Sequence, residues 1–101
     1  MIYGFGDCEV DFDRAELRRC GQRVEITPQE LRLLDVFLRN RGRVLSREQI
    51  IEAAWGHGVA ITDRAVDTHV FNLRKKIEAL PSEPRLLVGV RGLGYRFEHD
   101  N

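Results

Sequence analysis

The sequence predicts an α+β fold in which an N-terminal antiparallel β platform precedes three helices and a C-terminal β-hairpin. Three observations support this prediction. Apolar and polar residues alternate near the N-terminus, two helix-capping signals follow, and glycines interrupt a β-patterned run near the C-terminus. The 101 residues are 43% hydrophobic, which is enough for one modest core. We therefore expect a single domain over residues 1–101.

Strands are expected between residues 3 and 26. Within residues 5–12, the apolar residues Cys8, Val10 and Phe12 alternate with Glu9 and Asp11 in the period of a half-buried strand. Residues 13–14 are expected to turn the chain, and residues 17–26 repeat the strand character around a turn at Gly21. These segments predict a platform of three or four short strands.

Two capping boxes predict where the first two helices begin. Residues 27–30, Thr-Pro-Gln-Glu, place a capping threonine before a proline at the first helical position and a glutamate at the third, which predicts a helix over about 28–41. Residues 46–49, Ser-Arg-Glu-Gln, repeat the box and predict a second helix over about 47–55. With the helix that follows, this second helix would form a helix-turn-helix.

A third helix is expected over about 63–80, capped by Thr62 or Asp63 and ended by the prolines that follow. Four aliphatic residues fall within one narrow arc of this helix: Val66, Val70, Leu73 and Ile77. The opposite side gathers residue types that contact nucleic acid: Arg64, Thr68, Phe71, Asn72 and Lys75. Only the aliphatic side needs a core, so the other side is free to meet a partner.

Residues 86–98 predict the C-terminal hairpin. Its β pattern is broken at residues 92–94, Gly-Leu-Gly, and Arg91 and Arg96 flank the break, which places arginines at the expected tip. The glycines permit close approach, and the arginines suit insertion into a groove of duplex DNA. A helix followed by such a hairpin is the arrangement called a winged helix.

Several short segments along nearly the whole chain match one protein family in order. They are Thr27-Pro28 with Leu31 and Leu34, residues 44–48, Trp55-Gly56, residues 64–70, residues 73–76 and residues 90–96. On these segments the chain resembles the C-terminal effector domain of OmpR/PhoB-type response regulators. The resemblance implies a winged helix-turn-helix that binds duplex DNA for transcription regulation, with the third helix in the major groove and the wing in the adjacent minor groove.

The resemblance also implies partners. Members of this family carry the domain behind a phosphorylated receiver domain, and they usually occupy tandem direct repeats on DNA as homodimers. The loop over residues 56–61 corresponds to a segment that some relatives use to touch RNA polymerase. We therefore expect the output domain of a bacterial two-component regulator, acting in the cytoplasm.

Four side chains are candidates for reading bases. Asn72 can form a bidentate hydrogen-bond pair with adenine, and Thr68 can donate to a base or touch a thymine methyl group. Exposure of the large apolar Phe71 ring to water is unfavourable, so its functional interpretation is contact with a thymine methyl group. The alternative is that Phe71 packs at the edge of the core, under the wing. Arg91 is the candidate for the narrow minor groove of A·T-rich DNA.

Four charged residues of the third helix have different expected roles. Arg64 and Lys75 can reach phosphate or guanine. Lys76 is interpreted as a solvated charge or a phosphate contact. Asp67 is expected to make an intramolecular ion pair or hydrogen bond, because DNA phosphate repels a carboxylate.

Further candidate DNA contacts come from the resemblance and from the side-chain types. The resemblance implies that His69 and Arg74 approach the phosphate backbone and that Tyr95 contacts DNA, although Tyr95 can instead be a packing residue of the hairpin. Trp55, at the end of the second helix, can lie in the core with its indole N–H reaching a phosphate. Gly92 is expected to let the wing approach the groove closely.

The charges are unevenly distributed along the chain. Sixteen basic and sixteen acidic residues cancel, but residues 1–30 hold four arginines against seven acids, whereas residues 31–96 hold twelve basic residues against seven acids. A basic face toward DNA and an acidic back toward another partner are therefore expected. A protein-interaction winged helix is the main alternative, because the zero net charge and Phe71 also suit a protein partner.

Other functional classes find little support. No catalytic triad or phosphate-binding loop is readable, so we expect no enzyme. Cys8 and Cys20 lack zinc-ligand spacing, and the histidines at 57, 69 and 99 are scattered, so we expect neither a metal nor another cofactor. No run is long and apolar enough to predict a membrane span.

Overall fold

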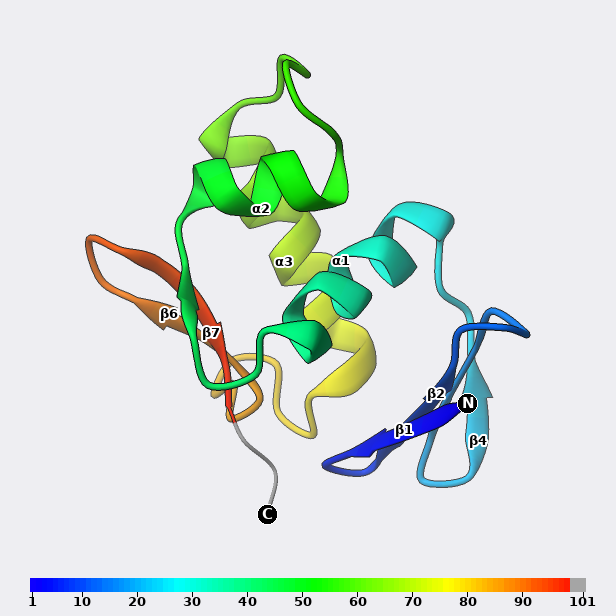
Figure 1. Cartoon of the computed structure of the whole chain (residues 1–101). Helices are drawn as coiled ribbons and strands as arrows, with labels where there is room; N and C mark the ends of the chain where they lie inside the picture. The colour runs from blue at the N-terminus through cyan, green and yellow to red at the C-terminus, as the bar shows by residue number, and fades with distance from the viewer. Residues whose placement is uncertain (99–101) are drawn as a thin grey trace.

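The computed structural model describes residues 1–98, in which two β-sheets lie on either side of three helices (Figure 1). In chain order the elements are β1 (Ile2–Phe5), β2 (Cys8–Asp11), β3 (Glu16–Arg19), β4 (Gln22–Val24), α1 (Pro28–Arg39), β5 (Val44–Leu45), α2 (Arg47–Ala54), α3 (Asp63–Ile77), β6 (Leu87–Val90) and β7 (Gly94–Phe97). This order confirms the predicted α+β class. His99, considered above as a metal ligand, lies outside the described residues. No helix in the described part of the chain has the length and apolar character needed to cross a membrane.

The N-terminal platform is a four-stranded antiparallel sheet in the order β1-β2-β3-β4. The prediction of one strand over residues 5–12 is wrong, because a turn at Gly6-Asp7 separates β1 from β2. Gly6 has a φ of +52°, a conformation that glycine adopts without a steric penalty. The predicted turn at Gly21, between β3 and β4, is confirmed.

Both capping boxes form as predicted and set the starts of α1 and α2. Thr27 Oγ1 accepts a hydrogen bond from the Glu30 N–H at 3.1 Å, and the Glu30 carboxylate accepts one from the Thr27 N–H at 2.9 Å. Ser46 and Gln49 make the same exchange at 3.1 and 2.9 Å. Thr62 caps α3. The ends of α1 and α2 lie within two residues of their predicted positions.

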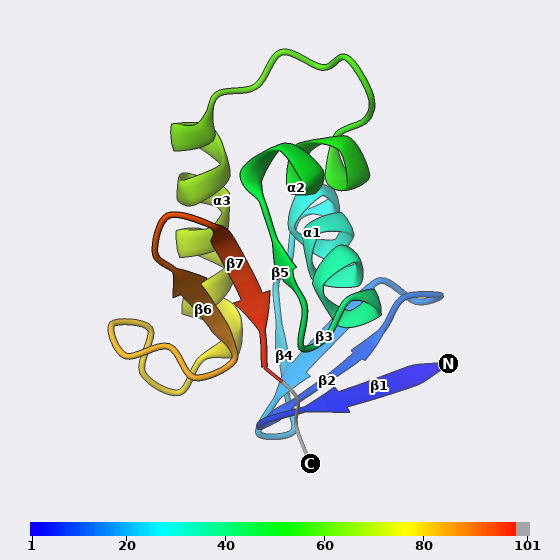
Figure 2. The same ribbon diagram turned by 60° about the vertical axis from the view of Figure 1, so that its left-hand side comes forward.

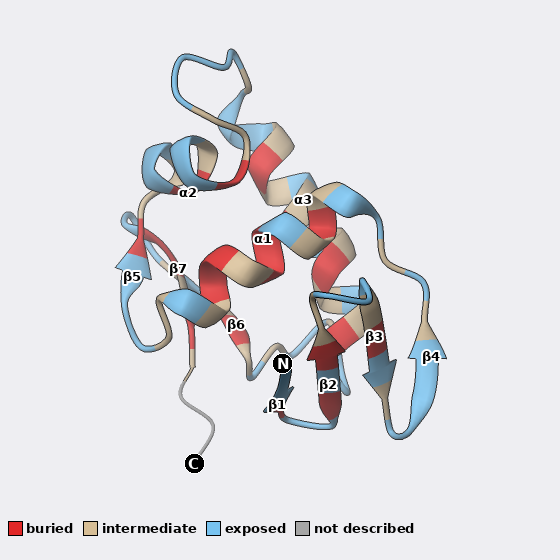
Figure 3. Ribbon diagram, turned by 45° about the vertical axis from the view of Figure 1, so that its right-hand side comes forward, coloured by how far each residue is buried: buried red, intermediate tan, exposed pale blue. Residues whose placement is uncertain are grey.

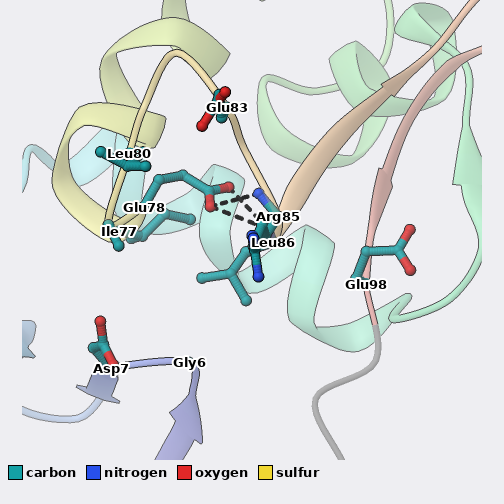
Figure 4. Close-up of a pocket in the computed structure, with 10 residues that line it drawn as sticks. Gly6, Asp7, Ile77, Glu78, Leu80, Glu83, Arg85, Leu86 and Glu98 are labelled. Carbon is teal, nitrogen blue, oxygen red and sulfur yellow. Dashed lines mark hydrogen bonds between the residues drawn. The ribbon is translucent and has the colours of Figure 1, made fainter.

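The prediction that α3 continues to about residue 80 is wrong, because the helix ends at Ile77. Glu78 has extended backbone angles, with φ −89° and ψ 141°, and is only 2% exposed. Its carboxylate accepts hydrogen bonds of 2.9 to 3.1 Å from the N–H groups of Arg85 and Leu86 (Figure 4). It also accepts one of 2.8 Å from the N–H group of Leu87. These bonds organise the loop before β6, beside a hollow of about 440 Å³, and they replace the last turn of the expected helix.

The hairpin belongs to a three-stranded sheet in the order β5-β7-β6. The sequence pattern does not predict β5, because its two residues are too few to show an alternation. A Cβ at Gly94 would lie 2.0 Å from the carbonyl oxygen of Leu45, so the close approach at Gly94 is made by the protein's own backbone and not by DNA. Arg96 lies within β7 with its Nε 2.5 Å from Glu98, so its predicted position at the hairpin tip is wrong.

The core lies where the helices meet both sheets, as the buried segments in Figure 3 show. The ring of Phe97 in β7 lies 5.5 Å from that of Phe5 in β1 and 6.5 Å from that of Phe37 in α1, measured between centroids. The predicted aliphatic face of α3 is confirmed, because its four residues are at most 1% exposed: Val66, Val70, Leu73 and Ile77. Burial on this side leaves the opposite side of α3 open, beside the β6–β7 hairpin (Figure 2).

Candidate nucleic-acid interface

The open side of α3 carries cationic and polar groups that are free to contact a partner. Arg64 and Lys75 are exposed and make no ion pair within residues 1–98. Asn72 is half-buried, and its amide makes no hydrogen bond within the same range, so both its donor and its acceptor remain available. The Thr68 hydroxyl donates to the Arg64 carbonyl at 3.0 Å, which leaves its methyl group and its oxygen lone pairs for a partner.

The Phe71 side chain is exposed to solvent on this same side of α3. It is 53% exposed, so the alternative in which it packs under the wing is wrong. Lys75, one helical turn later, places its Nζ 4.4 Å from the centroid of the Phe71 ring. The pair therefore presents apolar surface directly beside a positive charge, a combination that suits a groove with apolar base edges and anionic walls.

His69 and Trp55 contact each other at the edge of this surface. Their ring centroids lie 5.0 Å apart in an edge-to-face arrangement. His69 Nδ1 lies 2.8 Å from the Ala65 carbonyl oxygen. Since a carbonyl oxygen only accepts, Nδ1 donates this hydrogen bond, and Nε2 remains for a partner. Trp55 is half-buried at the C-cap of α2, and its indole nitrogen makes no hydrogen bond within residues 1–98.

Asp67 is bound within the protein, which confirms its predicted intramolecular role. Its carboxylate accepts two hydrogen bonds from Arg47, at 2.9 and 3.3 Å, and one from the Tyr95 hydroxyl at 2.5 Å. Burial opposes ionisation of Asp67, but the hydrogen bonds from Arg47 and Tyr95 outweigh it and lower the pKa of the carboxyl. Burial and the bond to Asp67 raise the pKa of the Tyr95 hydroxyl.

Tyr95 and Arg74 also contact each other, between α3 and the wing. Tyr95 is 7% exposed and its hydroxyl already binds Asp67, so the structure places it as a packing residue of the hairpin. Arg74 donates from Nε to the Leu87 carbonyl oxygen at 2.8 Å, and its guanidinium lies 5.5 Å from the centroid of the Tyr95 ring. Arg74 is half-buried, and its other N–H groups remain for a phosphate.

Lys76 pairs with Glu30 within the protein, so its interpretation as a solvated charge is wrong. Its Nζ forms an ion pair and a hydrogen bond with Glu30, whose side chain is 7% exposed. Burial disfavours the charged form of Glu30, but hydrogen bonds from Lys76 and from the Thr27 N–H lower the pKa of the carboxyl overall. The pair ties the C-terminal half of α3 to the start of α1.

The wing presents its exposed residues at the turn between β6 and β7. Arg91 is exposed and makes no ion pair in the described part of the chain. Gly92 has a φ of +78° with open space around it, so the turn leaves room for a close approach. Leu93, which the sequence did not single out, is 62% exposed beside them. The tip therefore offers one arginine and one apolar side chain.

Arg47 is a member of this surface that the sequence reasoning missed. It is the first residue of α2, and its guanidinium lies 5.6 Å from the centroid of the Tyr95 ring. A shallow depression of about 360 Å³ separates it from the wing, lined by Arg47, Gly89, Val90, Arg91, Gly92, Gly94 and Tyr95. The signal that could have found Arg47 is its place at a helix N-terminus next to a capping serine, where backbone N–H groups favour anions.

Some acidic side chains of the N-terminal platform are paired within the protein. Glu16 lies 3.7 to 4.0 Å from Arg14, Arg18 and Arg23, and Asp13 pairs with the N-terminal amino group at 3.0 Å. The expected acidic back is therefore only partly compensated, because Asp7, Glu9, Asp11 and Glu25 make no ion pair within residues 1–98. Within residues 1–98, no group of three or more His, Cys, Asp or Glu residues could hold a metal ion.

Comparison with known sequences identifies relatives along almost the whole chain. A family model described as transcriptional regulatory protein, C terminal, matches residues 21–97. The transcriptional regulatory protein CseB of Streptomyces coelicolor is 45% identical over 97 residues, which are 96% of this chain and 39% of CseB. The phosphate regulon transcriptional regulatory protein PhoB of Rhizobium meliloti is 38% identical over 92% of this chain and 40% of PhoB. The chain thus spans less than half the length of these relatives.

Solved structures share the fold. The response regulator DrrB, an OmpR/PhoB homologue of Thermotoga maritima, superposes with a TM-score of 0.87 at 32% identity, over 97% of this chain and 44% of DrrB. The DNA-binding domain of Klebsiella pneumoniae RstA, solved in complex with the RstA box, superposes with a TM-score of 0.83 at 25% identity, over 96% of both chains. Sequence and fold together show that the chain belongs to the family of C-terminal domains of OmpR/PhoB-type transcriptional regulatory proteins.

Proposed function

We propose that this domain binds duplex DNA sequence-specifically and regulates transcription as the output domain of a two-component response regulator. The observation that carries the proposal is the open side of α3. There Arg64 and Lys75 are exposed and make no ion pair within residues 1–98, the Phe71 ring is exposed, and the helix lies beside a wing tipped by Arg91 (Figure 2). A cationic surface with unsatisfied polar groups and one apolar ring matches the chemistry of a major groove. Family membership supports the same conclusion.

In this proposal α3 enters the major groove and the wing enters the adjacent minor groove. Asn72 reads an adenine, Thr68 and Phe71 meet thymine methyl groups, and Arg91 enters the minor groove. Backbone phosphates are contacted by the surrounding residues: Trp55, Arg64, His69, Arg74, Lys75 and the Gly92 turn. Tyr95 contributes indirectly, because its hydroxyl is bound to Asp67.

The partners of the full-length protein are also proposals. The chain corresponds to less than half of its relatives' length, which supports a receiver domain in the whole protein. Binding as a homodimer on tandem direct repeats would bring two copies of α3 to one side of the duplex. The α2–α3 loop, in which Val59 is 45% exposed, is a candidate contact for RNA polymerase. This activity would take place in the bacterial cytoplasm, where the DNA lies.

Salt dependence tests the proposal. With about four to six phosphates neutralised per domain, log affinity should fall with log salt at a slope of about −4 to −5. In parallel, Asn72→Ala should relax the preference at one adenine by about 1 to 3 kcal/mol and leave other positions unchanged. A slope near zero would reject phosphate contact, and equal losses on all sequences would reject the role of Asn72.

A protein-interaction module is the second candidate. The zero net charge of the chain and the bare ring of Phe71 favour it. The same titration separates the two functions, because a protein-interaction module would show no salt-sensitive affinity for duplex DNA. Loss of binding in the Asn72→Ala variant, restricted to one base, is expected only from a DNA reader.

A further inference from the structure

The carboxylate of Asp67 joins the recognition helix to two other elements. It lies in α3, accepts hydrogen bonds at 2.9 and 3.3 Å from Arg47 at the start of α2, and accepts one at 2.5 Å from Tyr95 in β7. A free carboxylate on the recognition helix would repel DNA phosphate. The Asp67 carboxylate is bound within the protein instead, and its contacts indicate a structural role directed at the wing.

A second attachment connects the same helix to the other strand of the hairpin. Arg74 Nε donates to the Leu87 carbonyl oxygen in β6 at 2.8 Å. The guanidinium groups of Arg47 and Arg74 lie 5.6 and 5.5 Å from the centroid of the Tyr95 ring. Tyr95 is therefore held by a hydrogen bond and by two cations. Both strands of the wing are fixed to α3, β6 at its first residue Leu87 and β7 at Tyr95, one residue pair from the turn.

The wing needs these attachments to α3 because a two-stranded hairpin alone is only marginally stable. Its tip is exposed at Arg91 and Leu93, and β5 supports only the part of β7 near Tyr95. Reading two grooves at once requires side chains to be held within about half an ångström of their productive geometry. The angle between α3 and the wing is thus the quantity on which simultaneous contact depends.

We propose that Asp67 is a positioning residue for DNA recognition, whose bonds to Tyr95 and Arg47 set the wing angle so that Arg91 reaches the minor groove while α3 occupies the major groove. This inference rests on the proposed function and extends it. Asp67 touches no base in this scheme. It acts through Arg91, and its effect should therefore appear as a lost preference for the sequence flanking the core site.

The experiment compares affinities for two duplexes that share one core site and differ only in A·T-rich or G·C-rich flanks. The wild-type domain should prefer the A·T-rich flank by about five- to tenfold, because the narrow minor groove attracts arginine. Asp67→Asn and Tyr95→Phe should each reduce this ratio to about twofold or less. The matched control is Asp35→Asn, which removes a carboxylate paired with Arg39 at 3.0 Å on the exposed side of α1 and should keep the wild-type ratio.

The affinity for the G·C-rich duplex provides a second readout, and it should not fall when the flank ratio falls. Both aspartate variants remove one negative charge, so binding to the G·C-rich duplex should stay equal or rise slightly. Arg91→Ala should lower the flank ratio in the wild-type background and have no further effect in Asp67→Asn. A merely structural loss would lower affinity for both duplexes equally and leave the ratio unchanged.

The outcomes separate the two proposals. If the wild-type domain shows no salt-sensitive binding, the proposed function fails. If it binds and either Tyr95→Phe or a folded Asp67→Asn keeps the wild-type flank ratio, the positioning role of Asp67 is refuted. Tyr95→Phe retains the ring and removes only the hydroxyl, so it decides the question even if Asp67→Asn does not fold.

Discussion

Gly94 is the position where a single methyl group should damage the wing most. It has a φ of +141°, and a Cβ there would lie 2.0 Å from the Leu45 carbonyl oxygen and 2.9 Å from Ser46 Cα. Both of these neighbours are backbone atoms, which cannot turn aside as a side chain can. Gly94→Ala must therefore shift β5 away from β7 or distort the start of β7.

The cost follows from two contributions. Placing an L-residue in this backbone region costs about 1 to 3 kcal/mol, and overpacking against fixed atoms adds about 1 to 3 kcal/mol. Gly92 provides the matched control in the same turn, with a φ of +78° and no atom within 4 Å of the added Cβ. Gly92→Ala should cost only about 1 to 2 kcal/mol, which is the conformational strain alone.

Urea denaturation measures both variants, with the fluorescence of Trp55, the single tryptophan, as the signal. Gly94→Ala should lower the free energy of unfolding by about 2 to 6 kcal/mol, a large part of the total stability of a domain this small. If Gly94→Ala costs no more than Gly92→Ala, the close contact with Leu45 does not exist as described, and the reasoning is refuted.

Three further predictions concern other sites. Phe71→Ala should change the free energy of unfolding by less than about 0.5 kcal/mol but weaken specific DNA binding by up to about 2 kcal/mol, measured by titration; unchanged affinity would contradict its base contact. Cys20 should react with iodoacetamide at pH 8 and Cys8 should not, because burial raises the pKa of Cys8 to about 12; intact mass would reveal a contradictory second adduct. Glu30→Gln should cost about 1 to 3 kcal/mol at pH 7. Because the folded-state pKa of Glu30 is lowered, its stabilisation is present above the unfolded-state pKa and is lost as the pH falls through the folded-state pKa. The free energies of unfolding of the wild-type domain and of Glu30→Gln, measured by denaturation, should therefore converge at acid pH.

Local signals in the sequence predicted the helices well. The two capping boxes are formed by residues that contact one another within a single turn, so their geometry depends on little else. The aliphatic stripe of α3 was equally readable, because a period of 3.6 residues leaves few alternatives. The same periodicity placed Phe71 and Asn72 on the open side, where the structure has them exposed and half-buried, respectively.

Tertiary contacts decided the features that the sequence did not predict. The end of α3 depends on the bonds of Glu78 to a loop that begins several residues later, and no local pattern reveals them. Likewise, β5 exists only because β7 returns beside it. The pairing of Lys76 with Glu30 spans 46 positions, and the binding of Tyr95 to Asp67 spans 28, so neither side chain's partner could be identified from spacing.

The most direct test of the central claim is to select bound duplexes from a random pool over several rounds and to sequence them. The account predicts enrichment of a short motif containing an adenine read by Asn72 and thymines beside Phe71, with A·T-rich flanks for Arg91 and repeats about one helical turn apart. Absence of any enriched motif at low salt would contradict sequence-specific DNA binding by this surface.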